Sequence, residues 1–208
     1  KAHLINVVGV KNLAEICKEF NTILIHISTD FVFDGTKDSP YSEEDIPNPK
    51  SVYGQTKLDG EKAIQETWQK HFIIRTSWVY SQFGNNFMKT MLRLVAERDK
   101  LSVVNDQIGT PTNAVDLAEA LLKIVTEHSK RNIKHYGIYN FSNEGQCSWY
   151  YFAKKIFEFN NVKINLEPIP TTSFPTPAKR PAYSVLDKTK IKKVFGVEVK
   201  YWEEGLKR

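Results

Sequence analysis

Short apolar runs alternate with amphipathic stretches along most of this chain of 208 residues. The runs are rich in β-branched residues, and the stretches between them carry apolar residues at helical spacing. The expected strands are 22–27, 72–80, 101–104 and 137–142, and the expected helices are 1–20, 53–68, 85–97, 112–128 and 148–160. Such alternation is typical of an α/β protein with a parallel sheet and right-handed crossovers.

The pattern changes after residue 162. The segment 166–187 carries five prolines and little periodicity, and a short helix is expected at 188–195. We interpret this tail as a small subdomain or lid lying against the sheet. Asn113 and Ser148 precede two of the expected helices and are good N-cap residues.

Composition favours a soluble globular protein, with 41% hydrophobic and 25% charged residues. The net charge of +5 comes from scattered lysines, which indicates a solvated surface and no nucleic-acid partner, and suits a small anionic substrate. No apolar run is long enough to span a membrane, and no signal peptide is present. Cys17 and Cys147 lie far apart, as expected of free thiols in the cytoplasm.

Polar residues follow the first two long strands. The stretch Ser28–Asp30 ends one of them, and Ser77 and Trp78 lie near the end of the next. Tyr53 opens the intervening helix, and Lys57 lies one turn later on the same face. Because ligands of parallel α/β sheets bind at the carboxyl ends of strands, one site is expected to collect three side chains. They are Thr29, Tyr53 and Lys57.

This combination suits proton transfer during reduction of a carbonyl. Hydride delivery creates an alkoxide that needs a proton, and a tyrosine phenol with an ordinary pKa of about 10 can supply it. A nearby ammonium such as that of Lys57 lowers the pKa of the phenol, so Tyr53 can act near neutral pH. Thr29 can hold the substrate oxygen, and the lysine can bind a cofactor ribose. Tyr-x-x-x-Lys alone also occurs by chance, as a surface tyrosine beside a solvated lysine.

Longer motifs add a resemblance that covers nearly the whole chain. They include "HISTDFVFDG", "YSEEDIPNPKSVYGQTKLDGEKAI", "IIRTSWVYSQFGNNFMKTMLRL", "VVNDQIGTPTNAVDLAEAL" and "KRPAYSVLD". These motifs follow one another in the family order. The chain therefore resembles the extended short-chain dehydrogenase/reductase superfamily, and within it the dTDP-4-dehydrorhamnose reductases. The resemblance implies a Rossmann-like, doubly wound sheet in residues 1–145 that binds NADPH or NADH. It implies a C-terminal part, 146–208, that includes a small substrate-binding subdomain.

The resemblance also implies an activity, reduction of the 4-keto group of a dTDP-deoxysugar in the cytoplasm. A homodimer is considered as the assembly, and the participation of magnesium stays open. The implied catalytic residues are Thr29, Tyr53 and Lys57, and the implied cofactor contacts are Ser28, Tyr53, Lys57 and Ser77. The implied substrate contacts are Asp30, Phe31, Trp78, Asn86 and Arg180, with no metal ligand. Plainer alternatives are core packing for Trp78, a helix cap for Asn86 and an ordinary surface charge for Arg180.

Two departures from the family pattern bear on these expectations. Phe31 replaces the usual tyrosine, which removes a hydroxyl near the sugar and affects substrate preference. The Gly-x-x-Gly-x-x-Gly turn that holds a dinucleotide pyrophosphate is absent from the 208 residues. We therefore expect the chain to start within the helix before the fourth strand of the family fold. In isolation it is then expected to be inactive and to bind dinucleotide weakly.

Proteins with three other functions share this scaffold. Nucleotide-sugar dehydratases carry an Asp-Glu pair after the threonine, and Phe31 cannot perform the acid–base work of that glutamate. Dehydration is therefore excluded. A nucleotide-sugar epimerase stays an alternative, as does a non-catalytic regulatory subunit, although the complete Thr-Tyr-Lys set favours an enzyme.

Overall fold

A parallel sheet of three strands forms the centre of the larger lobe. The computed structural model describes residues 1–131, 134–176 and 180–207. Strands β1 (Leu24–Thr29), β2 (His71–Thr76) and β7 (Gly137–Asn140) lie in the order β1-β2-β7. Thr29 pairs with Thr76, so β1 and β2 end level with each other. The carboxyl ends of these strands therefore lie along one edge.

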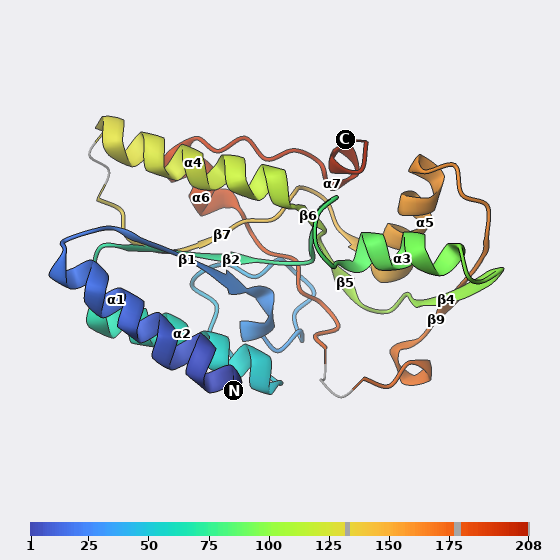
Figure 1. Ribbon diagram of the computed structural model, residues 1–208, viewed down its shortest axis with the longest axis horizontal. Coiled ribbons are helices and arrows are strands. Elements are labelled where there is room, and N and C mark those ends of the chain that lie inside the picture. Colours follow the sequence, from blue (N-terminus) through green and yellow to red (C-terminus); the bar gives the residue numbers. More distant parts are fainter. Residues whose placement is uncertain (132–133, 177–179, 208) are drawn as a thin grey trace.

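Helices cover both faces of this sheet, as Figure 1 shows. On one face lie the π-helical segment η1 (Leu4–Gly9), α1 (Val10–Glu19) and α2 (Val52–Thr67). On the other lie α4 (Ala114–Arg131) and α6 (Thr189–Phe195). Every residue of β2 is buried, as expected of a central strand covered on both faces, and its middle residues 72–74 are apolar without alternation. The expected doubly wound α/β architecture is confirmed.

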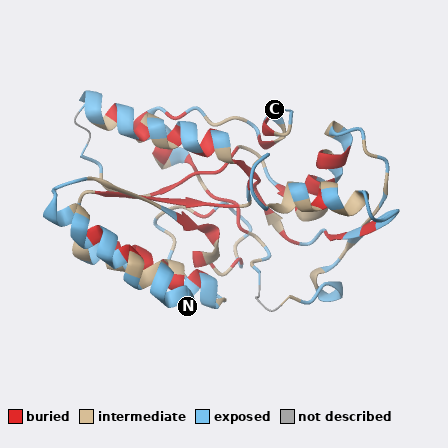
Figure 2. Ribbon diagram, viewed as in Figure 1, coloured by how far each residue is buried: buried red, intermediate tan, exposed pale blue. Residues whose placement is uncertain are grey.

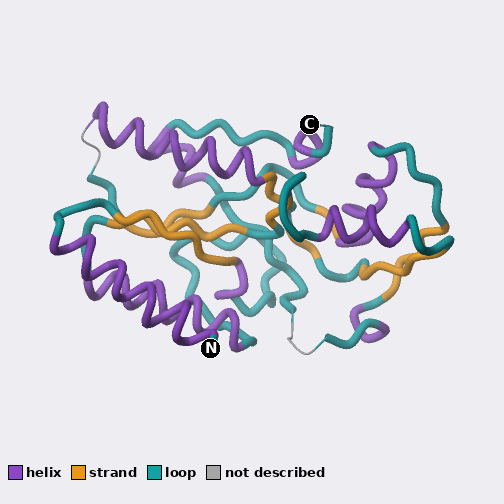
Figure 3. Tube along the Cα trace, viewed as in Figure 1, coloured by secondary structure: helices purple, strands orange, loops and turns teal. Residues whose placement is uncertain are grey.

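A second, smaller lobe packs around its own apolar cluster. It contains α3 (Phe87–Val95), α5 (Trp149–Phe159) and the parallel pair β4 (Lys100–Val104) and β9 (Asn165–Ile169). Figure 3 shows this pair at the end of the molecule away from the large sheet. Short strands connect the lobes: β3 (Val79–Tyr80) with β6 (Thr112–Asn113), and β5 (Ile108–Gly109) with β8 (Cys147–Ser148). The last helix is α7 (Trp202–Gly205).

Burial follows the two lobes (Figure 2). One core lies between the sheet and α4 and α6, with Phe72, Ile74 and Phe195 fully covered. The core of the second lobe includes Phe152 and Trp202. Both cores consist of side chains far apart in sequence, so only the folded chain forms them.

Most expected helices are confirmed, together with both caps. The Asn113 side chain accepts from the Val115 backbone N–H at 2.8 Å, and the Ser148 hydroxyl accepts from Tyr151 N–H at 3.1 Å. One strand expectation is wrong, because 72–80 is not continuous. The backbone at Trp78 has φ of 46°, which ends β2 and starts the separate strand β3. The sequence reading also missed β9, an edge strand that tolerates Pro168.

The C-terminal tail contributes to both lobes. Strand β9 pairs with β4 in the smaller lobe, whereas α6 packs on the sheet of the larger one. Between them, Tyr41 bridges Leu186, and a Cβ placed on Gly35 would lie 2.4 Å from Pro181. The expected lid over 166–187 thus includes a strand and a segment packed on the 30–41 loop. Residues 177–179 of that lid lie outside the described residues. The division at residue 145 remains a proposal.

Candidate functional site

The end of β1 and the start of α2 lie side by side at the carboxyl edge of the sheet. Thr29 ends β1 and caps the short 3-10 helix η2 (Asp30–Val32), and Ser51 caps α2 by accepting from Gly54 N–H at 3.1 Å. A Cβ on Gly54 would lie 2.2 Å from the Phe31 carbonyl oxygen. Glycine at this position therefore permits the close approach that brings Tyr53 beside Thr29.

Tyr53 is half exposed, at 48%. Its ring contacts Phe31 edge to face, with ring centroids 5.7 Å apart and an interplanar angle of 75°. Burial raises the pKa of the phenol, the hydrogen bond with the Thr29 hydroxyl lowers it, and the charge of Asp30 raises it. The net direction is upward, so the phenol holds its proton firmly.

Lys57 lies on α2, one turn after Tyr53. Its ammonium donates to the Ile27 carbonyl oxygen at 2.7 Å and lies 3.2 Å from Nε2 of His26. Burial lowers the pKa of the lysine, while nearby Glu61 raises it. Burial is the largest cause acting on the pKa of the Tyr53 phenol and raises it, and the expected lowering of that pKa by Lys57 stays a proposal.

Asp30 is almost fully buried, at 2% exposure, directly behind Thr29. The Thr29 hydroxyl donates to Oδ1 of Asp30 at 3.0 Å, and the Phe31 backbone N–H donates to the Thr29 oxygen at 3.2 Å. Burial raises the pKa of the carboxyl to about 6, against lowering by the Ser184 and Thr29 hydroxyls and by backbone N–H groups. Its burial places Asp30 behind the expected sugar site, so it stays a proposed substrate contact.

A buried ion pair that the sequence reading missed lies beneath the site. Glu61, one turn beyond Lys57 on α2, binds Arg75 of β2 with Oε2 and Nη2 2.7 Å apart. Ser28, proposed as a cofactor contact, donates its hydroxyl to Oε1 of Glu61. The side chains of Glu61 and Arg75 are 1% and 2% exposed. The signal that could have indicated it is Arg75 itself, a charge inside a strand expected to be buried on both faces, which needs a buried partner.

At the neighbouring strand end, Ser77 and Trp78 point in different directions. The Ser77 hydroxyl donates to the Thr110 carbonyl oxygen at 2.8 Å and is buried. Trp78 stacks on Trp149, with centroids 3.5 Å apart and planes at 12°. The guanidinium of Arg180 lies 5.9 Å from the Trp149 centroid, which is within cation–π range. The sequence reading missed Trp149, which joins two proposed substrate contacts into one stack.

Asn86 caps α3, which is the plainer alternative to a substrate contact. Its Oδ1 accepts from Lys89 N–H at 3.2 Å, and its Nδ2 donates to the Ser81 carbonyl oxygen at 2.6 Å. Both ends of the amide are therefore used in shaping the start of α3. A substrate contact at Asn86 remains a proposal.

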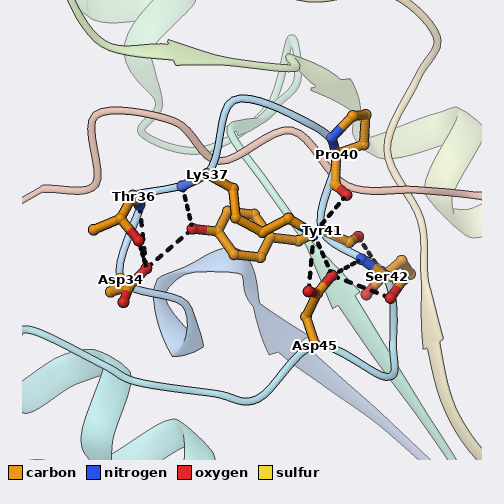
Figure 4. A network of polar contacts seen from close by, with 8 residues as sticks. Asp34, Thr36, Lys37, Pro40, Tyr41, Ser42 and Asp45 are labelled. Carbon is orange, nitrogen blue, oxygen red and sulfur yellow. Dashed lines mark hydrogen bonds and ion pairs between the residues drawn. The ribbon is translucent and has the colours of Figure 1, made fainter.

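The loop after η2 is held by a dense set of polar contacts, drawn in Figure 4. The Tyr41 hydroxyl donates to Asp34 at 3.1 Å and accepts from Lys37 N–H at 3.2 Å. The Lys37 ammonium binds both oxygens of Asp45 at 2.8 Å. Hydrogen bonds from Thr36 and its neighbours lower the pKa of Asp34 to about 2. These contacts fix a loop that the sequence presents only as Pro- and Gly-rich.

The residues at the edge fit the nicotinamide end of a dinucleotide. Lys57 has three N–H donors, of which two face Ile27 and His26, so one stays available for a ribose hydroxyl. The Gly-rich cradle for the pyrophosphate is not in the sequence. Within the described ranges, no three His, Cys, Asp or Glu side chains cluster to hold a metal. Along that same part of the chain, every helix is too short or too polar to traverse a bilayer.

Comparison with known proteins places the whole chain in one group. The model of the family described as RmlD substrate binding domain matches residues 1–208. A dTDP-4-dehydrorhamnose reductase of Aggregatibacter actinomycetemcomitans is 45% identical over 99% of this chain and 72% of its own length. That of Escherichia coli K12 is 43% identical, over 100% and 71% respectively.

Solved structures agree with the sequence comparison. A dTDP-4-dehydrorhamnose reductase from Bacillus anthracis, in complex with NADP, superposes with a TM-score of 0.92 at 42% identity. The match covers 98% of this chain and 70% of that one. A dTDP-glucose 4,6-dehydratase from the same organism, at 21% identity and a TM-score of 0.80, shares the fold.

Proposed function

Because this chain belongs to the dTDP-4-dehydrorhamnose reductase family, we propose that it reduces the 4-keto group of a dTDP-4-dehydro-6-deoxy sugar with NADPH or NADH. The observation that carries the proposal is the meeting of Thr29, Tyr53 and Lys57 at one edge of the sheet. It is supported by the reductase relatives and by the relative solved with NADP.

Tyr53 supplies the proton in this mechanism. A nicotinamide held at this edge would supply the hydride to the sugar carbon, and Tyr53 would give its phenol proton to the oxygen that was the carbonyl. Burial and the charge of Asp30 raise the pKa of Tyr53, so the residue enters each cycle protonated. A phenol is a useful acid here because the alkoxide that forms is far more basic than a phenolate.

Lys57 is proposed to hold neighbouring groups in position while its ammonium keeps its own protons. Its contacts with Ile27 and His26 fix the ammonium against β1, and its remaining donor would bind a ribose hydroxyl of the cofactor. Its charge also stabilises the phenolate that Tyr53 leaves behind, since the two side chains lie one helical turn apart. The indole of Trp78, with Trp149 and Arg180 behind it, is proposed to form a wall of the sugar site.

The proposal is tested by following NADPH and NADH absorbance at 340 nm with the dTDP-4-keto sugar, using protein that also carries a Gly-rich pyrophosphate turn, because residues 1–208 alone are expected to be inactive. Oxidation of the cofactor with formation of dTDP-rhamnose is expected. Turnover of a different nucleotide-sugar, with none of this one, would show that an epimerase or another reductase is the right assignment. Calorimetric titration of residues 1–208 with each cofactor separates weak cofactor binding from a wrong substrate.

A homodimer and a cytoplasmic location also remain proposals. The dimer is supported by large apolar side chains exposed on η1 and α1, among them Ile5 at 62%, Leu13 at 58% and Phe20 at 69%. Large exposed apolar side chains of this kind favour association where they gather in a patch. Sedimentation velocity on the protein and on the Leu13→Glu variant tests the dimer, which the charge should dissociate.

A further inference from the structure

We propose that Trp149 is a positioning residue that holds the indole of Trp78 in one orientation where the sugar of the substrate is expected to bind. Trp149 acts through Trp78, which is itself a proposed substrate contact. The inference therefore rests on the proposed function and deepens it, because it names what sets the shape of the sugar site. It is carried by the backbone and ring contacts around Trp78.

The backbone of Trp78 is fixed by its surroundings. It lies just beyond β2, whose end is level with that of β1. Its φ of 46° is rare for a bulky residue, and such a conformation persists only where the surrounding structure imposes it. Here the Ser77 hydroxyl donates to the Thr110 carbonyl oxygen at 2.8 Å, and the Trp78 carbonyl oxygen accepts from Thr112 N–H at 3.2 Å. Hydrogen bonds on both sides of the residue therefore fix the point from which the indole leaves the chain.

Ring contacts then fix the indole on that backbone. The Trp149 indole lies nearly parallel to it, with centroids 3.5 Å apart and planes at 12°. Aromatic pairs prefer offset or edge-to-face arrangements to direct stacking, so neighbouring groups must hold these two rings together. Beside Trp78, a Cβ placed on Gly109 would lie 2.5 Å from Cε2 of the indole, so the ring could not lie there if residue 109 carried a side chain. Beside Trp149, the Phe87 ring lies with its centroid 4.6 Å away.

The stack is a contact between the two lobes (Figure 1). Trp149 begins α5 of the smaller lobe, whereas Trp78 follows β2 of the larger one. The Arg180 guanidinium, from the C-terminal tail, lies 5.9 Å from the Trp149 centroid. Both indoles are half-buried, unlike Phe152 one turn further along α5, which is fully buried. The stack is therefore partly open to solvent, as a wall of a binding site must be, and is not part of the closed core.

The first test needs no ligand. Fluorotryptophan is incorporated into residues 1–208, and the fluorine NMR signal of Trp78 is assigned with Trp78→Phe. Trp149→Leu, which keeps apolar volume but removes the ring, should move this signal toward that of free fluorotryptophan and broaden it. Trp149→Phe, which keeps an aromatic ring, should preserve most of the wild-type shift and line width. An unchanged Trp78 signal in Trp149→Leu would overturn the proposal.

The second test compares the affinities for dTDP-rhamnose and for dTDP by calorimetry, in protein that also carries the Gly-rich pyrophosphate turn. Trp149→Leu should weaken the binding of dTDP-rhamnose about tenfold, the upper range for a lost aromatic pair, and leave that of dTDP unchanged. In a Trp78→Ala background the same change should have little further effect, because a positioning residue acts through its partner. Equal losses for the two ligands, or the same loss in both backgrounds, would overturn the proposal.

The two tests separate this inference from the proposed function. A wild-type protein that binds dTDP but gains nothing from the rhamnose would contradict the proposed function. The fluorine signals are recorded without ligand, so they would still decide whether Trp149 holds Trp78. Gly109→Ala gives a check from the other side of the indole, since it leaves Trp149 in place and should displace the Trp78 signal through the added Cβ.

Discussion

The Lys57 ammonium on α2 donates to the Ile27 carbonyl oxygen of β1 at 2.7 Å. This bond joins the helix that carries Tyr53 to the strand that ends in Thr29. It also places a fixed positive charge 3.2 Å from the His26 ring. His26 therefore reports on the position of Lys57 without any ligand.

Lys57→Met should raise the pKa of His26. Burial is the larger cause of the low His26 pKa of about 4, and the Lys57 charge is the second. Removal of the charge should therefore bring the pKa part of the way toward 6.5. Histidine Cε1–H chemical shifts against pH measure it, and an unchanged midpoint would place the ammonium away from the ring.

His26 should make the protein less stable in mild acid. Its pKa is lower in the folded state than the unfolded value of 6.5, so protonation favours the unfolded chain. The free energy of unfolding is then lost between about pH 6.5 and 4. Asp30, whose pKa is raised to about 6, acts in the opposite direction, so the comparison is between wild type and His26→Asn. Urea titrations across this range should show a shallower loss in the variant.

In protein that also carries the Gly-rich pyrophosphate turn, Tyr53→Phe should lower kcat by roughly 100-fold or more, the scale of a lost general acid. Cofactor affinity should change little, because the ring and its contact with Phe31 are retained. Lys57→Ala should weaken both. Steady-state rates and cofactor titrations give the two quantities. Near-normal kcat in Tyr53→Phe across pH would remove the residue from the mechanism.

Gly54→Ala should lower kcat strongly while it changes the thermal stability of the protein less. The added Cβ would lie 2.2 Å from the Phe31 carbonyl oxygen, so the start of α2 must move away from η2 and carry Tyr53 with it. Gly9→Ala is the matched control, since its Cβ would be 3.4 Å from the Leu4 carbonyl oxygen, an ordinary van der Waals contact. Thermal melts and kcat of both variants are compared, with the larger kcat loss expected in Gly54→Ala.

Glu61→Ala should cost about 3–5 kcal/mol of unfolding free energy, because it leaves Arg75 charged and unpaired in the interior. The Ser28 hydroxyl loses its acceptor at the same time. Glu66→Ala, on the exposed side of the same helix, should stay within about 0.5 kcal/mol of wild type. Urea denaturation measures both, and similar values would mean that the buried pair contributes little.

The sequence by itself determined the element types, and the motifs indicated the family and the chemical set Thr29, Tyr53 and Lys57. These follow from local rules: strand ends in a parallel sheet bring polar residues to one edge, and helical spacing puts Tyr53 and Lys57 on one face. The helix N-caps Asn113 and Ser148 were likewise predictable from the residues next to them in the sequence.

Only the tertiary structure decided which partner each group has. The pairing of Glu61 with Arg75, the burial of Asp30 against Ser184 and the stack of Trp78 on Trp149 all join residues far apart in the chain. The same holds for β9, whose partner β4 lies more than sixty residues earlier. Burial and hydrogen-bond partners set the direction of each pKa, and neither can be read from residue spacing, so the raised pKa of Tyr53 emerged only from the folded chain.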